Sequence, residues 1–240
     1  MGVPSRATVR LLVNPVVRGR EYLSELPGPF IFVANHPSEL DAPLLALVLA
    51  RIAPRLVAVG AAPQTGARGA FESALGLRSA GRLAGLLNRG VSVLLFPEND
   101  RADDGTLTPF NLGAARLGIQ TGVPIVPVAL SGTYRALPPW RHLPETSRPR
   151  VNVVFGRPIR PDAGSEPSAV NDDIVTAITL GMAEVKNGWY GALRAEAEGT
   201  LVAAGSASDE GGAETGTARW RRIWKATAPD EVQRRTVWVK

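Results

Sequence analysis

The sequence contains no cysteine and only two histidines among its 240 residues. Without cysteine, the chain can form no disulfide bond and offers no thiolate ligand to a metal ion. The Gly-x-Ser-x-Gly motif of serine hydrolases does not occur either, so a mechanism that acylates the protein itself has no obvious nucleophile.

Long apolar runs are also lacking. A membrane-spanning helix needs roughly 18 or more consecutive apolar residues, and the best candidate, residues 42–60, is interrupted by Arg51, Pro54 and Arg55. The N-terminus shows no hydrophobic segment of the secretory type. We therefore expect a cytoplasmic protein that is peripheral at the inner face of the cell membrane.

The distribution of apolar residues predicts an α/β fold. Hydrophobic residues make up 45% of the chain, which is enough for one substantial core. Apolar runs alternate with helix-like stretches, and this order favours a single domain with a mostly parallel central sheet flanked by helices. Strands are expected at about 30–35, 56–60, 91–96, 125–130 and 151–155, and helices at about 42–53, 79–89 and 110–121. Two prolines in the run 122–130 favour a sheet edge or a strand start.

One polar block directly follows the first of these strands. It reads Asn35-His36-Pro37-Ser38-Glu39-Leu40-Asp41. Histidine titrates near neutral pH and can accept a proton from an attacking hydroxyl. A turn between strand and helix could bring the carboxylate of Asp41 back to His36, where it would fix the tautomer of the imidazole ring. Alternatively, Asp41 is the N-cap of a helix and His36 an ordinary loop residue, and a capping aspartate could still bind the histidine.

A second polar block follows the strand near residues 91–95. It reads Phe96-Pro97-Glu98-Asn99-Asp100-Arg101, and active sites of α/β proteins gather at the carboxyl ends of strands. With the later run Val123-Pro124-Ile125-Val126-Pro127-Val128, these two blocks resemble the glycerolipid acyltransferases, the 1-acyl-glycerol-3-phosphate (lysophosphatidate) acyltransferase family. The resemblance covers about residues 15 to 160 and implies a glycerol-3-phosphate acyltransferase-like fold.

The resemblance implies transfer of a fatty acyl group from a thioester, acyl-CoA or acyl carrier protein, to a hydroxyl of a lysophospholipid such as 1-acyl-glycerol-3-phosphate. His36 would be the general base of an HX4D motif, and Asp41 would orient it. The donor is a substrate, and no cofactor or metal ion is expected.

The resemblance also implies that Glu98, Arg101 and an upstream arginine hold the phosphate-bearing acceptor, with Arg101 as a ligand of the phosphate. Arg78 fits the upstream position and Arg68 is an alternative, although each arginine could also be a surface charge. Asn99-Asp100 stands where the family usually has Gly-Thr, and a carboxylate beside a phosphate is unfavourable. A phosphate-free lipid acceptor, or a non-catalytic lipid-binding relative, is therefore an alternative.

The rest of the chain is expected to add smaller parts to an acyltransferase domain at residues 1–186. Asn171-Asp172-Asp173 could cap a helix that ends near Lys186. A helical extension at 187–203 and a Gly- and Ser-rich flexible linker at 204–218 would follow.

The final segment, residues 219–240, contains Trp220, Ile223 and Trp224 among arginines. As a helix it would suit an anionic membrane surface, although it could also dock on the domain or remain disordered. The net charge of +5 is explained by such a surface or by an anionic donor, because no nucleic-acid motif is evident. The expected partners are therefore an acyl thioester donor, a lipid acceptor and an anionic membrane, with no nucleic acid.

Overall fold

The computed structural model describes residues 6–24, 26–59, 80–98, 107–137, 147–198 and 200–201. The chain divides into two compact units, Met1–Ala207 and Ser208–Lys240, and every described residue belongs to the first. The predicted linker and the basic C-terminal segment lie outside the described residues. Among the described residues, no helix combines the length and apolar content that a membrane span requires.

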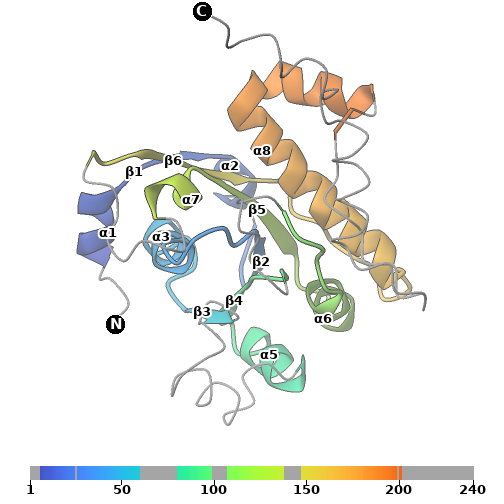
Figure 1. The fold of residues 1–240 in the computed structure, drawn as a ribbon. Helices are drawn as coiled ribbons and strands as arrows, with labels where there is room; N and C mark the ends of the chain where they lie inside the picture. The colour runs from blue at the N-terminus through green and yellow to red at the C-terminus, as the bar shows by residue number, and fades with distance from the viewer. Residues whose placement is uncertain are drawn as a thin grey trace, which may run out of the picture. The chain divides into compact units, whose positions relative to one another are not determined.

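A six-stranded sheet forms the centre of the first unit (Figure 1). Its strands are β1 (Asn14–Arg18), β2 (Ile31–Ala34), β3 (Leu56–Val59), β4 (Ser92–Leu95), β5 (Ile125–Ser131) and β6 (Arg150–Phe155), in the spatial order β1-β6-β5-β2-β4-β3. Neighbours are parallel except β5 and β6, which are antiparallel. The predicted fold class, a mostly parallel sheet flanked by helices, is confirmed.

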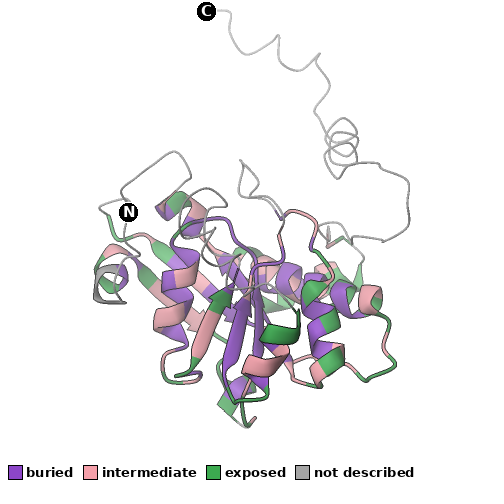
Figure 2. Ribbon diagram, turned by 90° about the horizontal axis from the view of Figure 1, so that it is seen from below, coloured by how far each residue is buried: buried purple, intermediate pink, exposed green. Residues whose placement is uncertain are grey.

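Helices cover both faces of the sheet. One face carries α1 (Arg6–Leu12), α3 (Asp41–Val48) and α7 (Thr133–Ala136), and the other carries α5 (Ala80–Leu87), α6 (Gly113–Thr121) and α8 (Pro167–Ala197). A short helix, α2 (Glu21–Ser24), follows β1. The central strands are buried along their length (Figure 2), as expected when helices shield a sheet from water on both sides.

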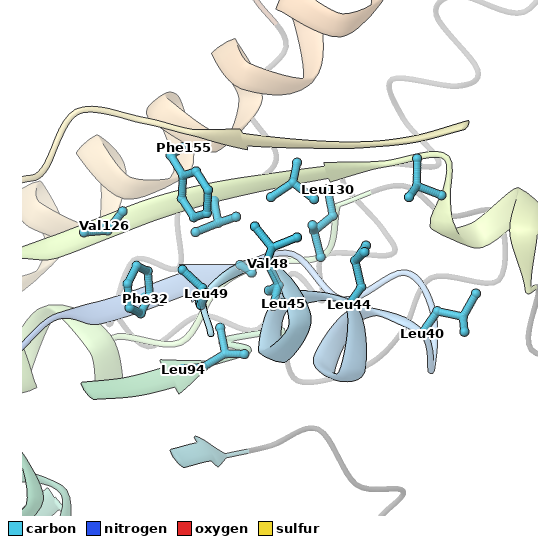
Figure 3. Close-up of a cluster of buried hydrophobic side chains, with 14 of the residues drawn as sticks. Phe32, Leu40, Leu44, Leu45, Val48, Leu49, Leu94, Val126, Leu130 and Phe155 are labelled. Carbon is cyan, nitrogen blue, oxygen red and sulfur yellow. The ribbon is translucent and has the colours of Figure 1, made fainter. Parts of the chain in front are cut away.

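The larger core cluster lies between α3 and the sheet (Figure 3). Leu44, Leu45 and Leu49 of α3 and its following turn pack there with Phe32 of β2 and Phe155 of β6. The rings of Phe32 and Phe155 meet edge to face with centroids 6.4 Å apart. Because this packing anchors α3 along its length, the start of α3 is held in a defined place beside the end of β2.

For the proline-containing strand, the expected edge position is wrong, because β5 lies between β6 and β2. The alternative of a strand start fits Pro124, which directly precedes the first residue of β5, but not Pro127. The ladder between β5 and β6 begins at Val128, and Gly156 N–H donates to the Pro127 carbonyl just outside it. Pro127 therefore faces the irregular chain beyond β6, where its missing N–H interrupts no strand pairing. Proline is tolerated here in the interior of a sheet for this reason.

Two further expectations need correction: the start of α8 and the absence of a strand before residue 30. Helix α8 begins at Pro167, not at Asn171, because proline suits the first turn of a helix, where its missing N–H has no intrahelical partner. The predicted end of this helix near Lys186 agrees with the structure, because the chain leaves helical geometry at Gly188, with φ 76° and ψ 164°, before the helix resumes to Ala197. Strand β1 was not predicted, since a five-residue strand containing Pro15 carries little sequence pattern.

Candidate active site

The candidate site lies at the carboxyl ends of β2 and β4, where the loop from β2 leads into α3. Asn35 is the first residue of this loop and is buried. Its side-chain Oδ1 accepts the N–H of Leu130 at 2.7 Å, and its Nδ2 donates to the carbonyl of Leu130 at 3.0 Å. The side chain therefore continues the β2–β5 ladder past the last backbone pair and sets the direction in which the loop leaves the sheet.

His36 and Asp41 meet across this loop. Nδ1 of His36 lies 3.0 Å from Oδ2 of Asp41, and both side chains are almost completely buried. The same Oδ2 accepts the N–H of Ser38 at 2.7 Å. An oxygen that already accepts one hydrogen bond is suited to accept a second from a protonated Nδ1, which leaves Nε2 as the nitrogen that can take up a proton. The imidazole ring stacks on Phe96 with centroids 4.2 Å apart.

Asp41 does not cap α3. It is the first residue of that helix, and the capping position is Leu40. The carboxylate turns back into the loop, and among the described residues Oδ1 has no hydrogen-bond partner. The alternative of Asp41 as an N-cap is therefore wrong, although its negative charge still lies favourably in the first helical turn.

Ser38 links the loop to α7. Its hydroxyl donates to the carbonyl of Leu137 at 2.8 Å and accepts the N–H of Leu40 at 3.2 Å. This contact joins the loop after β2 to the segment after β5, so the turn is held from two sides. Sequence reasoning gave no individual role to Ser38, Asn35 or Phe96, although all three belong to the two polar blocks that carry the family resemblance.

Glu98 reaches the loop from the end of β4. Its Oε1 accepts the backbone N–H of His36 at 2.8 Å, and its Oε2 accepts the hydroxyl of Thr108 at 3.2 Å. An antiparallel bridge joins Glu98 to Phe110, and Asn111 donates to the carbonyl of Pro97 through its backbone N–H and its side chain. The segment that follows β4 is thus connected to the segment that precedes α6.

Burial raises the pKa of Glu98 from its usual 4.5 to about 7. The hydrogen bonds from His36 and Thr108 favour the ionised form and partly oppose this effect, whereas the negative charge of Asp41 adds to it. A carboxyl group in this environment exchanges its proton near neutral pH. Glu98 therefore changes charge in the same range in which an ordinary histidine titrates.

The structure brings together His36, Asp41 and Glu98 of the predicted site residues. Arg78, its alternative Arg68, and Arg101 lie outside the described residues, so the predicted phosphate contacts stay predictions. Within the described ranges, no group of three or more His, Asp or Glu side chains could hold a metal ion. The chemistry of the described site is that of an imidazole oriented by a carboxylate.

The region that contains this site matches a known protein family. Residues 14–131 match the Acyltransferase family, and this stretch contains both His36 and Glu98. These residues form an acyltransferase-family domain. The resemblance inferred from the two polar blocks is thereby confirmed.

The acyltransferase domain also resembles individual proteins. It is 32% identical over 132 residues to the chloroplastic 1-acyl-sn-glycerol-3-phosphate acyltransferase BAT2 of Brassica napus, a match that covers 51% of this chain and 38% of the relative. The chloroplastic enzyme LPAT1 of Arabidopsis thaliana is 31% identical over 136 residues, covering 51% of this chain and 37% of the relative. The matched region thus spans well under half the length of these relatives.

A solved structure supports the same assignment. The crystal structure of the 1-acyl-sn-glycerophosphate acyltransferase PlsC of Thermotoga maritima superimposes with a TM-score of 0.60 and 26% identity, covering 76% of this chain and 77% of that one. The shared sheet and helix arrangement extends beyond the acyltransferase domain of residues 14–131 matched by sequence.

Proposed function

We propose that this protein transfers an acyl group from a thioester to the hydroxyl of a lysophospholipid such as 1-acyl-glycerol-3-phosphate. The observation that carries the proposal is the buried contact of 3.0 Å between Nδ1 of His36 and Oδ2 of Asp41 within an acyltransferase domain. The relatives support this class of reaction, since their names describe 1-acyl-sn-glycerol-3-phosphate acyltransferases.

In the proposed reaction, His36 acts as the general base. Asp41 accepts a hydrogen bond from Nδ1–H and stabilises the imidazolium, so Nε2 removes the proton of the acceptor hydroxyl as its oxygen attacks the thioester carbonyl. A carbon–oxygen bond forms, the tetrahedral intermediate collapses, and the carbon–sulfur bond breaks. The departing thiolate takes the proton from His36, which restores the neutral base. A positioned base of this kind contributes roughly 10²–10⁴-fold to the rate.

The proposed acceptor has two candidate classes, a lipid with a phosphate headgroup and a lipid without one. Asn99-Asp100 adds a carboxylate between Glu98 and Arg101, which disfavours an anionic headgroup unless a cation compensates. A phosphate-free lipid is therefore the second candidate acceptor. The donor, acyl-CoA or acyl carrier protein, is distinguished by supplying each one separately.

The test measures thiol release by the purified protein from long-chain acyl-CoA and, separately, from an acylated carrier protein. Lysophosphatidate and several phosphate-free lipids with a free hydroxyl serve as acceptors. We expect acceptor-dependent release in the wild type and a loss of at least about 10²-fold in His36→Ala, since the base is removed. His142→Ala is the matched control, because it removes the only other histidine. Equal turnover in His36→Ala and the wild type would exclude the proposed mechanism.

A further inference from the structure

Two side chains replace backbone pairing where β2 ends. The β2–β4 ladder stops at Val33 and Leu95, and Asn35 continues the sheet on the side of β5 through Leu130. On the side of β4, the carboxyl group of Glu98 accepts the N–H of His36 at 2.8 Å. On this side, past the last backbone pair of the β2–β4 ladder, the backbone N–H of His36 is therefore held by the side chain of Glu98.

We propose that Glu98 is a positioning residue that holds the backbone of His36, and not a residue that binds the acceptor. This inference rests on the proposed function, since it assigns Glu98 a part in the same reaction. It departs from the role that the family resemblance implies for Glu98.

Both oxygens of Glu98 bind the protein. Oε1 accepts the His36 N–H, and Oε2 accepts the Thr108 hydroxyl at 3.2 Å. Each of these oxygens could accept a further hydrogen bond, but a headgroup bound there would share the carboxylate with the contacts that hold the loop. A phosphate would also meet an unfavourable negative charge whenever Glu98 is ionised. The observed contacts thus suit the support of a loop better than the recognition of a substrate.

The segment 96–98 contacts His36 at two places. Phe96 stacks on the imidazole at 4.2 Å between ring centroids, and Glu98 binds the backbone N–H of the same residue. Removing the carboxyl group would leave that buried N–H without its partner and would loosen the ring from Phe96 and Asp41. A displacement of about 1 Å in a reacting group can cost about 10²-fold in rate.

The neutral form of Glu98 can hold the loop as well as the ionised form. A protonated carboxyl keeps one carbonyl oxygen, which can accept the His36 N–H, while its O–H can donate to Oγ1 of Thr108. Glutamine has the same shape, with a carbonyl oxygen for the His36 N–H and an amide donor for Oγ1 of Thr108, and it gives up only the long contact of 3.5 Å between Oε2 and the backbone N–H of Thr108. Glu98→Gln should therefore keep the support, whereas Glu98→Ala should lose it.

The first experiment separates kcat from the acceptor KM. In Glu98→Ala we expect kcat at saturating acceptor to fall about 10²-fold, with the acceptor KM unchanged, because the base is misplaced while the acceptor contacts remain. Glu98→Gln should keep the wild-type kcat and KM. A raised KM with unchanged kcat in Glu98→Ala, or equal damage by both substitutions, would overturn the positioning role. Glu21→Gln, an exposed glutamate of α2, is the control.

A second measurement does not depend on turnover. In a His142→Gln background His36 is the only histidine, so its ring protons give unique NMR signals. Stacking on Phe96 should shift these signals upfield in the wild type and in Glu98→Gln, and the shift should be lost in Glu98→Ala. An unchanged shift in a folded Glu98→Ala protein would reject the inference. If the wild type shows no turnover, the proposed function fails, while the NMR signals still decide the positioning role.

Discussion

At the scale of single residues, the site depends on side chains that act as extensions of the sheet. Asn35 presents one acceptor and one donor to Leu130, as a paired strand residue would. Only an amide offers both groups in this geometry, because a carboxylate has two acceptors and an aliphatic side chain has neither. The identity of residue 35 is therefore constrained by the fold as strongly as by any role in chemistry.

The substitution Asn35→Asp tests this constraint. The new carboxylate can still accept the N–H of Leu130, but its second oxygen faces the carbonyl of Leu130. Two acceptors would then meet without a proton, and we expect a loss of roughly 1–3 kcal/mol or more in the free energy of unfolding. Urea denaturation measures it, with Asn88→Asp at an exposed position as the control. Equal stability of the two variants would contradict the ladder interpretation.

Glu98 leads to a prediction about pH. Its pKa is about 7 in the folded protein and near the usual value when unfolded, so the folded state keeps a proton that the unfolded state releases. This contribution to stability is complete below about pH 4.5 and is lost as the pH rises through 7. Glutamine does not titrate, so Glu98→Gln removes this pH dependence of stability. Above pH 7 the free energy of unfolding of the variant should exceed that of the wild type by at most about 3 kcal/mol.

The measurement is the free energy of unfolding of wild type, Glu98→Gln and Glu21→Gln between pH 5 and pH 8. The wild type and Glu21→Gln should lose stability relative to Glu98→Gln as the pH rises across this range. Parallel curves for all three proteins would show that Glu98 titrates normally, because an unshifted carboxyl group contributes no slope there.

At the scale of elements, close packing of α8 on β5 depends on glycine. A Cβ atom on Gly181 would lie 2.8 Å from Cβ of Ala129, which is too short for two carbon atoms. Alanine is intrinsically better in a helix than glycine by about 1 kcal/mol, but overpacking costs typically 1–3 kcal/mol. If α8 cannot move away from β5, the cost of this contact exceeds the gain in helix propensity, and the substitution of Gly181 by alanine destabilises the protein.

We expect Gly181→Ala to lower the melting temperature. Gly81→Ala is the matched control, because Gly81 also lies in a helix and a Cβ there would meet nothing within 4 Å. That variant should be neutral or slightly stabilised by the helix propensity of alanine. Calorimetry of both variants checks the difference. A Gly181→Ala protein as stable as Gly81→Ala would mean that α8 moves away from β5 at little cost.

At the scale of the whole molecule, the described structure contains the acyltransferase-family domain with the proposed active site, whereas the predicted membrane attachment rests on sequence alone. Residues 219–240 contain the predicted basic and tryptophan-rich segment, which lies outside the described residues. The acyltransferase match ends at residue 131, and the first compact unit ends at Ala207. Chemistry and surface attachment should therefore be separable.

A chain that ends at residue 203 tests this separation. We expect it to keep turnover with dispersed, water-soluble short-chain substrates and to lose binding to vesicles that contain anionic phospholipid. Each cation near such a surface contributes about 1 kcal/mol to binding. Co-sedimentation with anionic and neutral vesicles measures the binding of both chains. Equal sedimentation of the shortened and the full chain would show that residues 1–203 contain the membrane-binding surface.

The sequence by itself determined the strand and helix alternation, and with it the fold class, because buried strands and amphipathic helices leave their pattern in local residue order. It also identified the His36 and Asp41 pair, since five positions are spanned by one turn. The interior position of β5 and the extra strand β1 depended on the tertiary structure. Which strands become neighbours is decided by packing between residues distant along the chain.

The support of the site was decided only in three dimensions. Glu98 and His36 are 62 residues apart, and Asn35 and Leu130 are 95 residues apart. Their hydrogen bonds exist because β4, β2 and β5 lie side by side and end at the same edge of the sheet. Local sequence specifies chemical groups, but their contacts across the sheet arise from the burial of apolar surface that brings the strands together.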